Sequence, residues 1–348
     1  MENMKKTIVK IIIGVLLIVC VLAVYFHKVV GWVYDNLTSP VYELDESSDE
    51  WTGGTTYLGV NYSDVSESDY VNIYVPDEVE HPTLFVMVHG GGFVCNDATS
   101  RQAQWMYRYF RNHGYACASV NYRLAQEEKY PAALEDVKAC IKYLRAHADV
   151  YGYDASNIVI WGESAGGYLA TMAAVTDDDE FCDLSYVDED VYGDVSAKVS
   201  VLVDFYGVID METAHSQWKE VGLPTFVYNI ANTWVTKYIP DDSDAKTIET
   251  YWLGKEISEM TEEELNEISP MVYLEENDNH DLAIWITHGD SDITVPILQS
   301  EYFYELAVEI LGENQVHYEI ISHGKHADDR CYSDEQLEKI DEFIKSNL

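Results

Sequence analysis

Short apolar runs alternate with longer amphipathic stretches from about residue 55 to the end of the chain. The run at residues 84–88 is apolar at every position, which is typical of a strand buried in the middle of a parallel sheet. Further strands are predicted at 55–62, 70–75, 116–122, 157–161, 199–205, 282–287 and 316–321. Helices are predicted at 102–113, 131–148, 167–174, 298–311 and 335–346. This alternation predicts an α/β fold, with a mostly parallel sheet covered by helices on both faces.

One long segment interrupts the alternation, because about 60 residues between Gly207 and Ser269 contain no clear strand. An insertion that follows a strand of an α/β sheet lies over the carboxyl edge of the sheet, where ligands bind. We therefore expect a helical cap at about residues 208–268. Most of its aromatic side chains are expected to form the cap's own core. These aromatic residues are Trp218, Phe226, Tyr228, Trp234, Tyr238 and Trp252.

An apolar run near the beginning of the chain, at residues 7–26, is interrupted only by Lys10. Roughly 20 apolar residues are long enough to cross a bilayer as a helix. Lys5 and Lys6 precede the run and acidic residues dominate after it, which predicts a single-pass membrane protein with its domain outside the cell. The alternative is a cleaved signal peptide and a secreted domain. The predicted parts are a signal anchor (1–30), a juxtamembrane linker (31–54) and an α/β domain (55–348).

Composition narrows the range of partners. The chain has 62 Asp and Glu against 21 Lys and Arg, which gives a formal net charge of −41. A surface of this sign repels nucleic acid and anionic lipid, so we expect neither as a ligand. The six cysteines are scattered without the spacing of metal ligands, so no metal site is expected.

The first candidate catalytic motif is Gly-Glu-Ser-Ala-Gly at residues 162–166. The motif lies between the predicted strand 157–161 and the predicted helix 167–174. A serine on such a sharp turn presents its hydroxyl clear of the backbone, and the flanking glycines avoid collisions across the turn. This setting favours Ser164 as a nucleophile over the alternative, a tight turn of structural importance only.

A serine nucleophile needs hydrogen-bond donors for the oxyanion that its attack creates. The sequence His-Gly-Gly-Gly at residues 89–92, the glycine loop, directly follows the strand at 84–88. Glycines let backbone N–H groups approach a developing negative charge without a side chain between them. We expect the oxyanion hole to consist of the N–H groups of Gly91, Gly92 and Ala165.

The serine also needs a base to take its proton and an acid to orient that base. Candidates for the acid are Asp290 and Asp292, in the loop after the next-to-last predicted strand. Candidates for the base are His323 and His326, in the loop after the last predicted strand. We choose Asp292 as the acid with Asp290 in reserve, and His326 rather than His323 as the base.

These motifs in this order resemble the hormone-sensitive-lipase-like and bacterial carboxylesterase branch of the α/β-hydrolases, which includes feruloyl and acetyl esterases. The resemblance covers about residues 83–327. It implies an α/β-hydrolase fold with Ser164 as nucleophile, His326 as base and Asp292 as acid, since the family's acid stands three residues before Val-Pro. The motifs that carry it are His-Gly-Gly-Gly at 89–92, Asn-Tyr-Arg-Leu at 121–124, Tyr-Pro-Ala-Ala-Leu-Glu-Asp at 130–136, Asp-Ala-Ser-Asn-Ile at 154–158, Gly-Glu-Ser-Ala-Gly-Gly at 162–167, Phe-Tyr-Gly at 205–207, Ser-Pro at 269–270, His-Gly at 288–289 and Val-Pro at 295–296.

The resemblance implies a serine hydrolase of carboxylic esters that works through a Ser-Asp-His triad and an acyl-enzyme, and this mechanism needs no cofactor or metal. It implies a small-molecule or carbohydrate-linked ester substrate, with a short acyl group of the acetyl type or a feruloyl group. Two alternatives stay open. One is an aminopeptidase or formamidase on the same fold. The other is a hydrolase-like binding protein without catalysis, which is disfavoured because every catalytic part has a candidate residue.

Overall fold

The computed structural model describes residues 26–348 except 28, 33, 39–50, 183–192, 223–235 and 277–280. The predicted membrane span at 7–26 therefore lies outside the described residues, apart from Phe26. Within the described ranges, no helix is both long enough and apolar enough to cross a membrane. Residues 26–38, without 28 and 33, are helical and are called the N-terminal helical segment.

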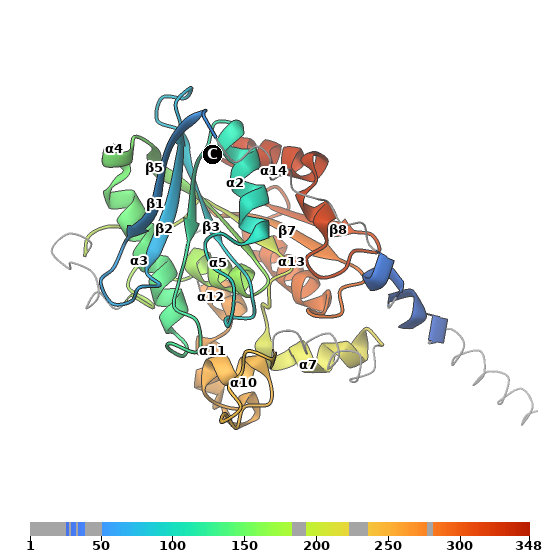
Figure 1. The fold of residues 1–348 in the computed structure, drawn as a ribbon. Coiled ribbons are helices and arrows are strands. Elements are labelled where there is room, and N and C mark those ends of the chain that lie inside the picture. The colour runs from blue at the N-terminus through green and yellow to red at the C-terminus, as the bar shows by residue number, and fades with distance from the viewer. Residues whose placement is uncertain are drawn as a thin grey trace, which may run out of the picture.

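The described residues form an eight-stranded sheet at the centre of the molecule (Figure 1), with the strand order β1-β2-β4-β3-β5-β6-β7-β8. β2 is antiparallel to both of its neighbours, whereas every neighbouring pair from β4 to β8 is parallel. The carboxyl ends of the parallel strands therefore meet at one edge of the sheet. The strands are β1 (Gly54–Asn61), β2 (Tyr70–Pro76), β3 (Thr83–Val88), β4 (Ala116–Val120), β5 (Asp154–Glu163), β6 (Val201–Phe205), β7 (Ala283–Gly289) and β8 (Val316–Ile321).

Helices cover both faces of the sheet, which confirms the predicted α/β class (Figure 1). α2 and α14 pack on one face, and α3, α5 and α13 pack on the other. Along β3, Leu84 and Val86 belong to one hydrophobic core and Phe85 and Met87 to the other, so the strand is apolar at every position. The helices are α2 (Arg101–Asn112), α3 (Ala132–Ala146), α4 (Ala148–Tyr151), α5 (Ala165–Val175), α7 (Met211–Glu220), α10 (Ile248–Leu253), η3 (Ile257–Glu259), α11 (Glu262–Glu267), α12 (Pro270–Glu276), α13 (Leu298–Leu311), η4 (Asp329–Tyr332) and α14 (Asp334–Asn347).

The predicted helix at 131–148 differs from the structure at both ends. Pro131 is the N-cap of α3 rather than part of its first turn. α3 ends at Ala146, and α4 follows as a separate turn. The break lies at His147, whose φ of −106° and ψ of 12° are not helical. The backbone N–H of His147 still donates to the carbonyl oxygen of Tyr143 at 3.1 Å, and its ring nitrogen Nδ1 lies 2.8 Å from the same oxygen, so the last helical carbonyl is bound twice where α3 ends.

The insertion between β6 and β7 is helical in its described part, and α7, α10 and α11 lie together at one end of the molecule (Figure 1). Trp252 of α10 stacks on Phe93, with ring centroids 3.8 Å apart. Since Phe93 directly follows the glycine loop, α10 packs at the carboxyl edge of the sheet. Trp252 and Trp218 are almost fully buried, but Trp252 packs against the α/β domain and Trp218 against the N-terminal helical segment, rather than in a core of the cap's own. Tyr238 is 39% exposed. Three other aromatic residues of the predicted cap lie outside the described residues, namely Phe226, Tyr228 and Trp234.

Candidate active site

Ser164 lies on the turn between β5 and α5, in a backbone conformation that a residue with a side chain rarely adopts. Its φ is +53° and its ψ is −118°. The N–H group of Ser164 donates to the carbonyl oxygen of Phe205 at 2.9 Å, which ties the turn to the end of β6. The turn requires a glycine at position 166, because the Cβ atom of any other residue would lie 2.3 Å from the carbonyl oxygen of Val88 and collide with it. The turn therefore presents the serine hydroxyl at the carboxyl edge of the sheet.

Three residues from separate loops form one hydrogen-bonded chain at this edge. The hydroxyl of Ser164 lies 3.0 Å from Nε2 of His326. Nδ1 of His326 lies 2.7 Å from Oδ2 of Asp292. The imidazole tautomer with its proton on Nδ1 satisfies both contacts, since it donates to the carboxylate and accepts from the hydroxyl. The structure thus brings together the serine, base and acid candidates that were chosen from the sequence.

Asp292 is completely buried in the acid loop, which comprises residues 290–296. Its Oδ1 atom accepts hydrogen bonds from the N–H groups of Thr294 at 2.7 Å and Val295 at 2.9 Å. Its Oδ2 atom also lies 3.2 Å from Nε2 of His288. Burial alone would raise the pKa of Asp292, but His326 and His288 outweigh burial and hold the pKa well below its usual range. The carboxylate is therefore ionised at neutral pH.

The reserve candidates, Asp290 and His323, lie outside this chain of hydrogen bonds. Oδ1 of Asp290 accepts the backbone N–H of His323 at 2.6 Å, which ties the acid loop to the base loop, residues 322–327. The side chain of His323 is 75% exposed, and its Nδ1 atom lies 3.1 Å from Oδ2 of Asp35. The structure therefore separates each pair of candidates, with Asp292 and His326 inside the hydrogen-bonded chain.

The glycine loop lies beside the serine turn with free backbone donors. Gly91 and Gly92 have φ angles of +119° and +60°, which glycine adopts without strain. Among the described residues, no group accepts a hydrogen bond from the N–H of either glycine. Ala165 is the first residue of α5, where N–H groups have no acceptor within the helix. The carbonyl oxygen of Gly91 accepts from the N–H groups of Val94 and Cys95, which holds the loop in place.

Glu163 is a buried carboxylate that the sequence reasoning passed over. Its Oε1 atom accepts the N–H of Gly90 at 3.1 Å, and its Oε2 atom accepts the hydroxyl of Tyr206 at 3.0 Å. The ring centroid of Tyr206 lies 4.8 Å from that of His326. Burial raises the pKa of Glu163, while His326 and both hydrogen bonds oppose the increase. Glu163 therefore joins the glycine loop to the surroundings of the imidazole.

The carboxylates of Asp292 and Glu163 also set the proton affinity of His326. Burial disfavours the charged imidazolium and would lower its pKa. The negative charge and hydrogen bond of Asp292 act in the opposite direction, and the charge of Glu163 adds to them. The net result is a pKa of His326 above its ordinary value. The imidazole is thus a stronger base than free histidine, which suits it to accept the proton of a serine hydroxyl.

A comparison with protein families identifies the chain. The family model BD-FAE matches residues 71–306, which is more than half of the chain. The chain belongs to the BD-FAE family. The BD-FAE match includes the glycine loop, Ser164 and Asp292. It ends before the base loop, so the choice of His326 rests on its contacts with Ser164 and Asp292.

Curated relatives of this BD-FAE protein carry esterase names. A "Probable carboxylic ester hydrolase" of Mycobacterium tuberculosis is 27% identical over 169 residues, which are 47% of this chain and 37% of that protein. An "Acetyl esterase" of Salmonella typhi is 31% identical over 126 residues, which are 36% of each chain. The chain therefore spans only about a third of the length of these two relatives.

Solved structures share the fold over most of the BD-FAE chain. A "Truncated form of carbohydrate esterase from gut microbiota" is 25% identical, with a TM-score of 0.67, and covers 89% of this chain and 99% of its own. A butyrate-bound esterase of Thermogutta terrifontis is 21% identical, with a TM-score of 0.59 and 85% of this chain covered, and supports the fold alone. These likenesses confirm the resemblance to the esterase branch of the α/β-hydrolases.

Three residues near the hydrogen-bonded chain were not assigned a role from the sequence. Glu163 occupies the variable position of the serine motif, and a carboxylate at the end of an apolar strand was the available signal. His288 and Tyr206 were part of motifs quoted for the resemblance, yet nothing in their spacing shows that they pack against Asp292 and His326. Their importance in this BD-FAE protein follows from three-dimensional contacts.

Proposed function

We propose that the protein is a serine hydrolase of carboxylic esters. The observation that carries this proposal is the hydrogen-bonded chain from Ser164 through His326 to Asp292. The esterase names of its relatives support the same reaction class. In the proposed first step, Oγ of Ser164 attacks the carbonyl carbon of the ester while its proton moves to Nε2 of His326. Asp292 stays ionised and stabilises the imidazolium that forms.

The attack turns the carbonyl oxygen into an oxyanion, which needs donors that are already in place. We assign this role to the N–H groups of Gly91, Gly92 and Ala165. The support for this assignment is that both glycines have unused donors and that Ala165 begins a helix, where N–H groups favour negative charge. These donors strengthen their interaction as charge develops on the oxygen, so they favour the transition state over the bound ester.

The tetrahedral intermediate then collapses and its bond to the alcohol oxygen breaks. The imidazolium of His326 gives its proton to that oxygen, and the acyl group stays on Ser164 as an ester. A water molecule takes the place of the alcohol, loses its proton to His326 and attacks the acyl carbon. The second intermediate releases the carboxylic acid, and the proton returns to Oγ of Ser164. Each cycle consumes one ester and one water, and it requires no external electron carrier.

We propose a short-acyl or carbohydrate-linked ester as the substrate, of the acetyl or feruloyl type. The support comes from the names of similar proteins, which include an acetyl esterase and a carbohydrate esterase. Neutral leaving groups are favoured, because a net charge of −41 repels anions from the surface.

The test is hydrolysis of p-nitrophenyl esters from acetate to long-chain acyl groups, by the wild type and by Ser164→Ala. We expect turnover that falls as the acyl chain lengthens, and a kcat lowered by roughly 10⁴- to 10⁶-fold in the variant. Most of the activity surviving in the variant would remove Ser164 from the mechanism. Turnover of p-nitroanilides with little ester turnover would instead favour an amide hydrolase.

We also propose that residues 7–26 anchor the protein in the cell membrane, with the domain outside the cell. This proposal is supported by the apolar run and the charges around it. Protease added to intact cells should digest the domain, and only detergent should extract the full chain. Release of the chain by high salt, or its appearance in the medium with a shortened N-terminus, would contradict the anchor.

A further inference from the structure

The N-terminal helical segment contacts both loops that complete the proposed active site. Nδ2 of Asn36 donates to the carbonyl oxygen of Ser291 at 2.7 Å. The hydroxyl of Ser291 donates to Oδ2 of Asp35 at 2.9 Å. The same Oδ2 atom lies 3.1 Å from Nδ1 of His323. One carboxylate of the segment therefore bridges the acid loop and the base loop.

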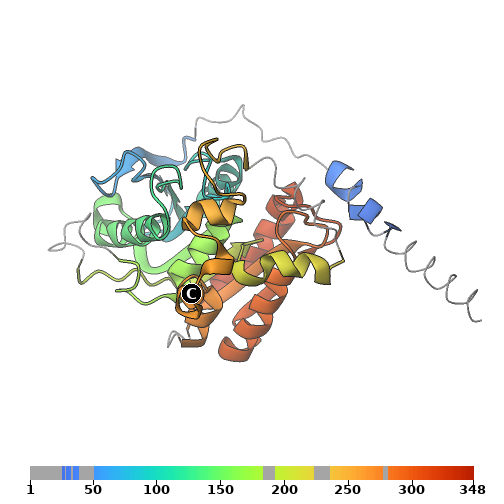
Figure 2. The ribbon, with the colours of Figure 1, turned by 90° about the horizontal axis from the view of Figure 1, so that it is seen from below.

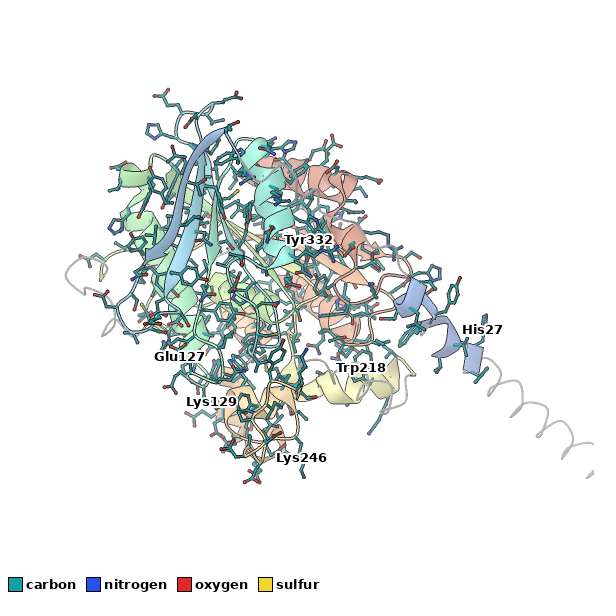
Figure 3. All side chains as sticks on the ribbon, in the orientation of Figure 1. His27, Glu127, Lys129, Trp218, Lys246 and Tyr332 are labelled. Carbon is teal, nitrogen blue, oxygen red and sulfur yellow. The ribbon has the colours of Figure 1, made fainter. Side chains whose placement is uncertain are left out.

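Apolar contacts extend this attachment to the insertion. Val29 and Trp32 of the segment pack against Trp218 of α7, together with Ile293 of the acid loop. Figure 3 shows Trp218 on α7, and Figures 1 and 2 both show the segment, in blue, beside the C-terminal half of the domain. The segment thus holds three parts of the molecule together, which are the insertion, the acid loop and the base loop.

The relative position of the two loops sets the geometry of the proposed triad. The hydrogen bond between them that matters for the reaction is the one from His326 to Asp292, at 2.7 Å. Ser291 is the residue before Asp292, so any group that holds Ser291 also fixes where that carboxylate lies. Misplacement of a reacting group by about 1 Å can lower a rate by about 10²-fold. A contact that restrains both loops at once is therefore placed to affect the rate.

We propose that Asp35 is a positioning residue for the active site, which acts by holding Ser291 and His323. This inference rests on the proposed esterase function. Asp35 and His323 both lie outside residues 71–306, the part of the chain that the family model matches. Ser291 lies inside the matched part, so the bridge joins two residues outside that part to one within it. Residues before the α/β domain become part of the working enzyme rather than a passive connection.

The test compares Asp35→Ala with the wild type in the full-length chain, using p-nitrophenyl acetate. We expect kcat to fall by about tenfold to a hundredfold while KM changes by less than about twofold, because the variant misaligns reacting groups without removing substrate contacts. Thr38→Ala is the matched control. Thr38 lies on the same segment, is exposed and bonds to the backbone of Tyr34, so both constants should stay within about twofold of the wild type.

A second measurement follows the loops directly, by hydrogen exchange of residues 289–296 and 322–328 in the same three proteins. Asp35→Ala should exchange faster than the wild type in both peptides, and Thr38→Ala should not. His323→Ala removes the contact between Asp35 and His323 from its other side. The kcat of the double variant Asp35→Ala/His323→Ala should therefore be no lower than that of whichever single variant has the lower kcat.

The outcomes separate this inference from the function on which it rests. Unchanged kcat in Asp35→Ala overturns the positioning role, whether or not the loops exchange faster. A lower melting temperature with unchanged kcat also overturns it, since that result describes a structural contact alone. A wild-type chain without esterase activity overturns the proposed function as well, and the exchange data then still show whether the segment restrains the loops.

Discussion

Two buried carboxylates flank His326, and their surroundings give them different roles. Asp292 accepts a hydrogen bond from the Nδ1–H group of His326 and is kept ionised by its neighbours. Glu163 makes no hydrogen bond to the imidazole in the described structure, and it acts on that ring through its charge. It also holds the N–H of Gly90, one residue before the proposed oxyanion donors. Asp292 therefore fixes the orientation of the proposed base, and Glu163 links that imidazole electrostatically to the glycine loop.

Substitution of each carboxylate should distinguish Asp292, the proposed acid, from its neighbour Asp290. We expect Asp292→Asn to lower kcat by about 10⁴-fold, because the amide favours the wrong imidazole tautomer and cannot stabilise the imidazolium. Asp290→Asn keeps an oxygen that can accept the N–H of His323, so its kcat should fall by less than about tenfold. Steady-state kinetics of both variants provides the measurement. Equal losses in the two variants would contradict the assignment of the acid.

The pH dependence of kcat/KM should reveal the effect of Glu163 on His326. The reaction needs the neutral imidazole, so activity should rise with pH through the pKa of His326, which lies above its ordinary value. Because the charge of Glu163 favours the imidazolium, Glu163→Gln should move the midpoint of this rise to lower pH. The measurement is kcat/KM for a neutral ester across the pH range. A midpoint that stays in place or moves upward would contradict the electrostatic role.

At the scale of elements, a third carboxylate lies where β6 meets α5. Asp204 is fully buried, and a Cβ atom on Gly167 or Gly207 would lie 2.4 Å from its Oδ1 atom. Neither of its carboxylate oxygens accepts a hydrogen bond of normal geometry from a described residue. Burial raises the pKa of Asp204 from 3.8 to about 7, against the opposing effect of the Gly207 backbone. Folding therefore favours its protonated form.

This raised pKa predicts how stability changes with pH. The contribution of protonated Asp204 is complete below pH 3.8 and is lost as the pH rises to about 7. Asn cannot ionise, so the stability of Asp204→Asn relative to the wild type should increase by about 2 kcal/mol between about pH 5 and pH 7. Urea unfolding at both pH values measures this difference. Asp149→Asn, on the exposed surface of α4, is the control, and a difference for Asp204→Asn that does not change with pH would contradict the burial argument.

Most strands and helices of the α/β domain could be predicted from the sequence, because their signals are local, whereas α12 and η4 were not predicted. Strands apolar at every position and helices with one apolar face were recovered with boundaries within a few residues. The serine turn, the glycine loop, Asp292 and His326 followed from motifs at the ends of those strands. The bridge from Asp35 to His323 had no such signal, since two polar residues far apart in sequence leave no periodic pattern. Asp204 was assigned only to a strand, because burial without a partner is visible only in the folded chain.

For the whole molecule, the acidic surface should discriminate among substrates. With a net charge of −41, kcat/KM for a p-nitrophenyl ester that carries a carboxylate should be lower than for the neutral acetate. Raising the salt from about 0.01 M to 1 M should narrow this gap by screening the repulsion. Kinetics at several salt concentrations provides the measurement, with the neutral ester as the control. An anionic ester turned over as fast as the neutral one at low salt would contradict this expectation.

The distance in sequence between the contacting parts has a consequence for biosynthesis. Asp35 lies 288 residues before its partner His323, and Ser164 lies 162 residues before its partner His326. A ribosome adds residues at about 5–20 per second, so a nascent chain exposes Ser164 many seconds before it has a histidine to activate it. The contact between Asp35 and His323 likewise cannot form until the base loop has been synthesised. The proposed nucleophile therefore lacks its proposed base until residue 326 has been added to the chain.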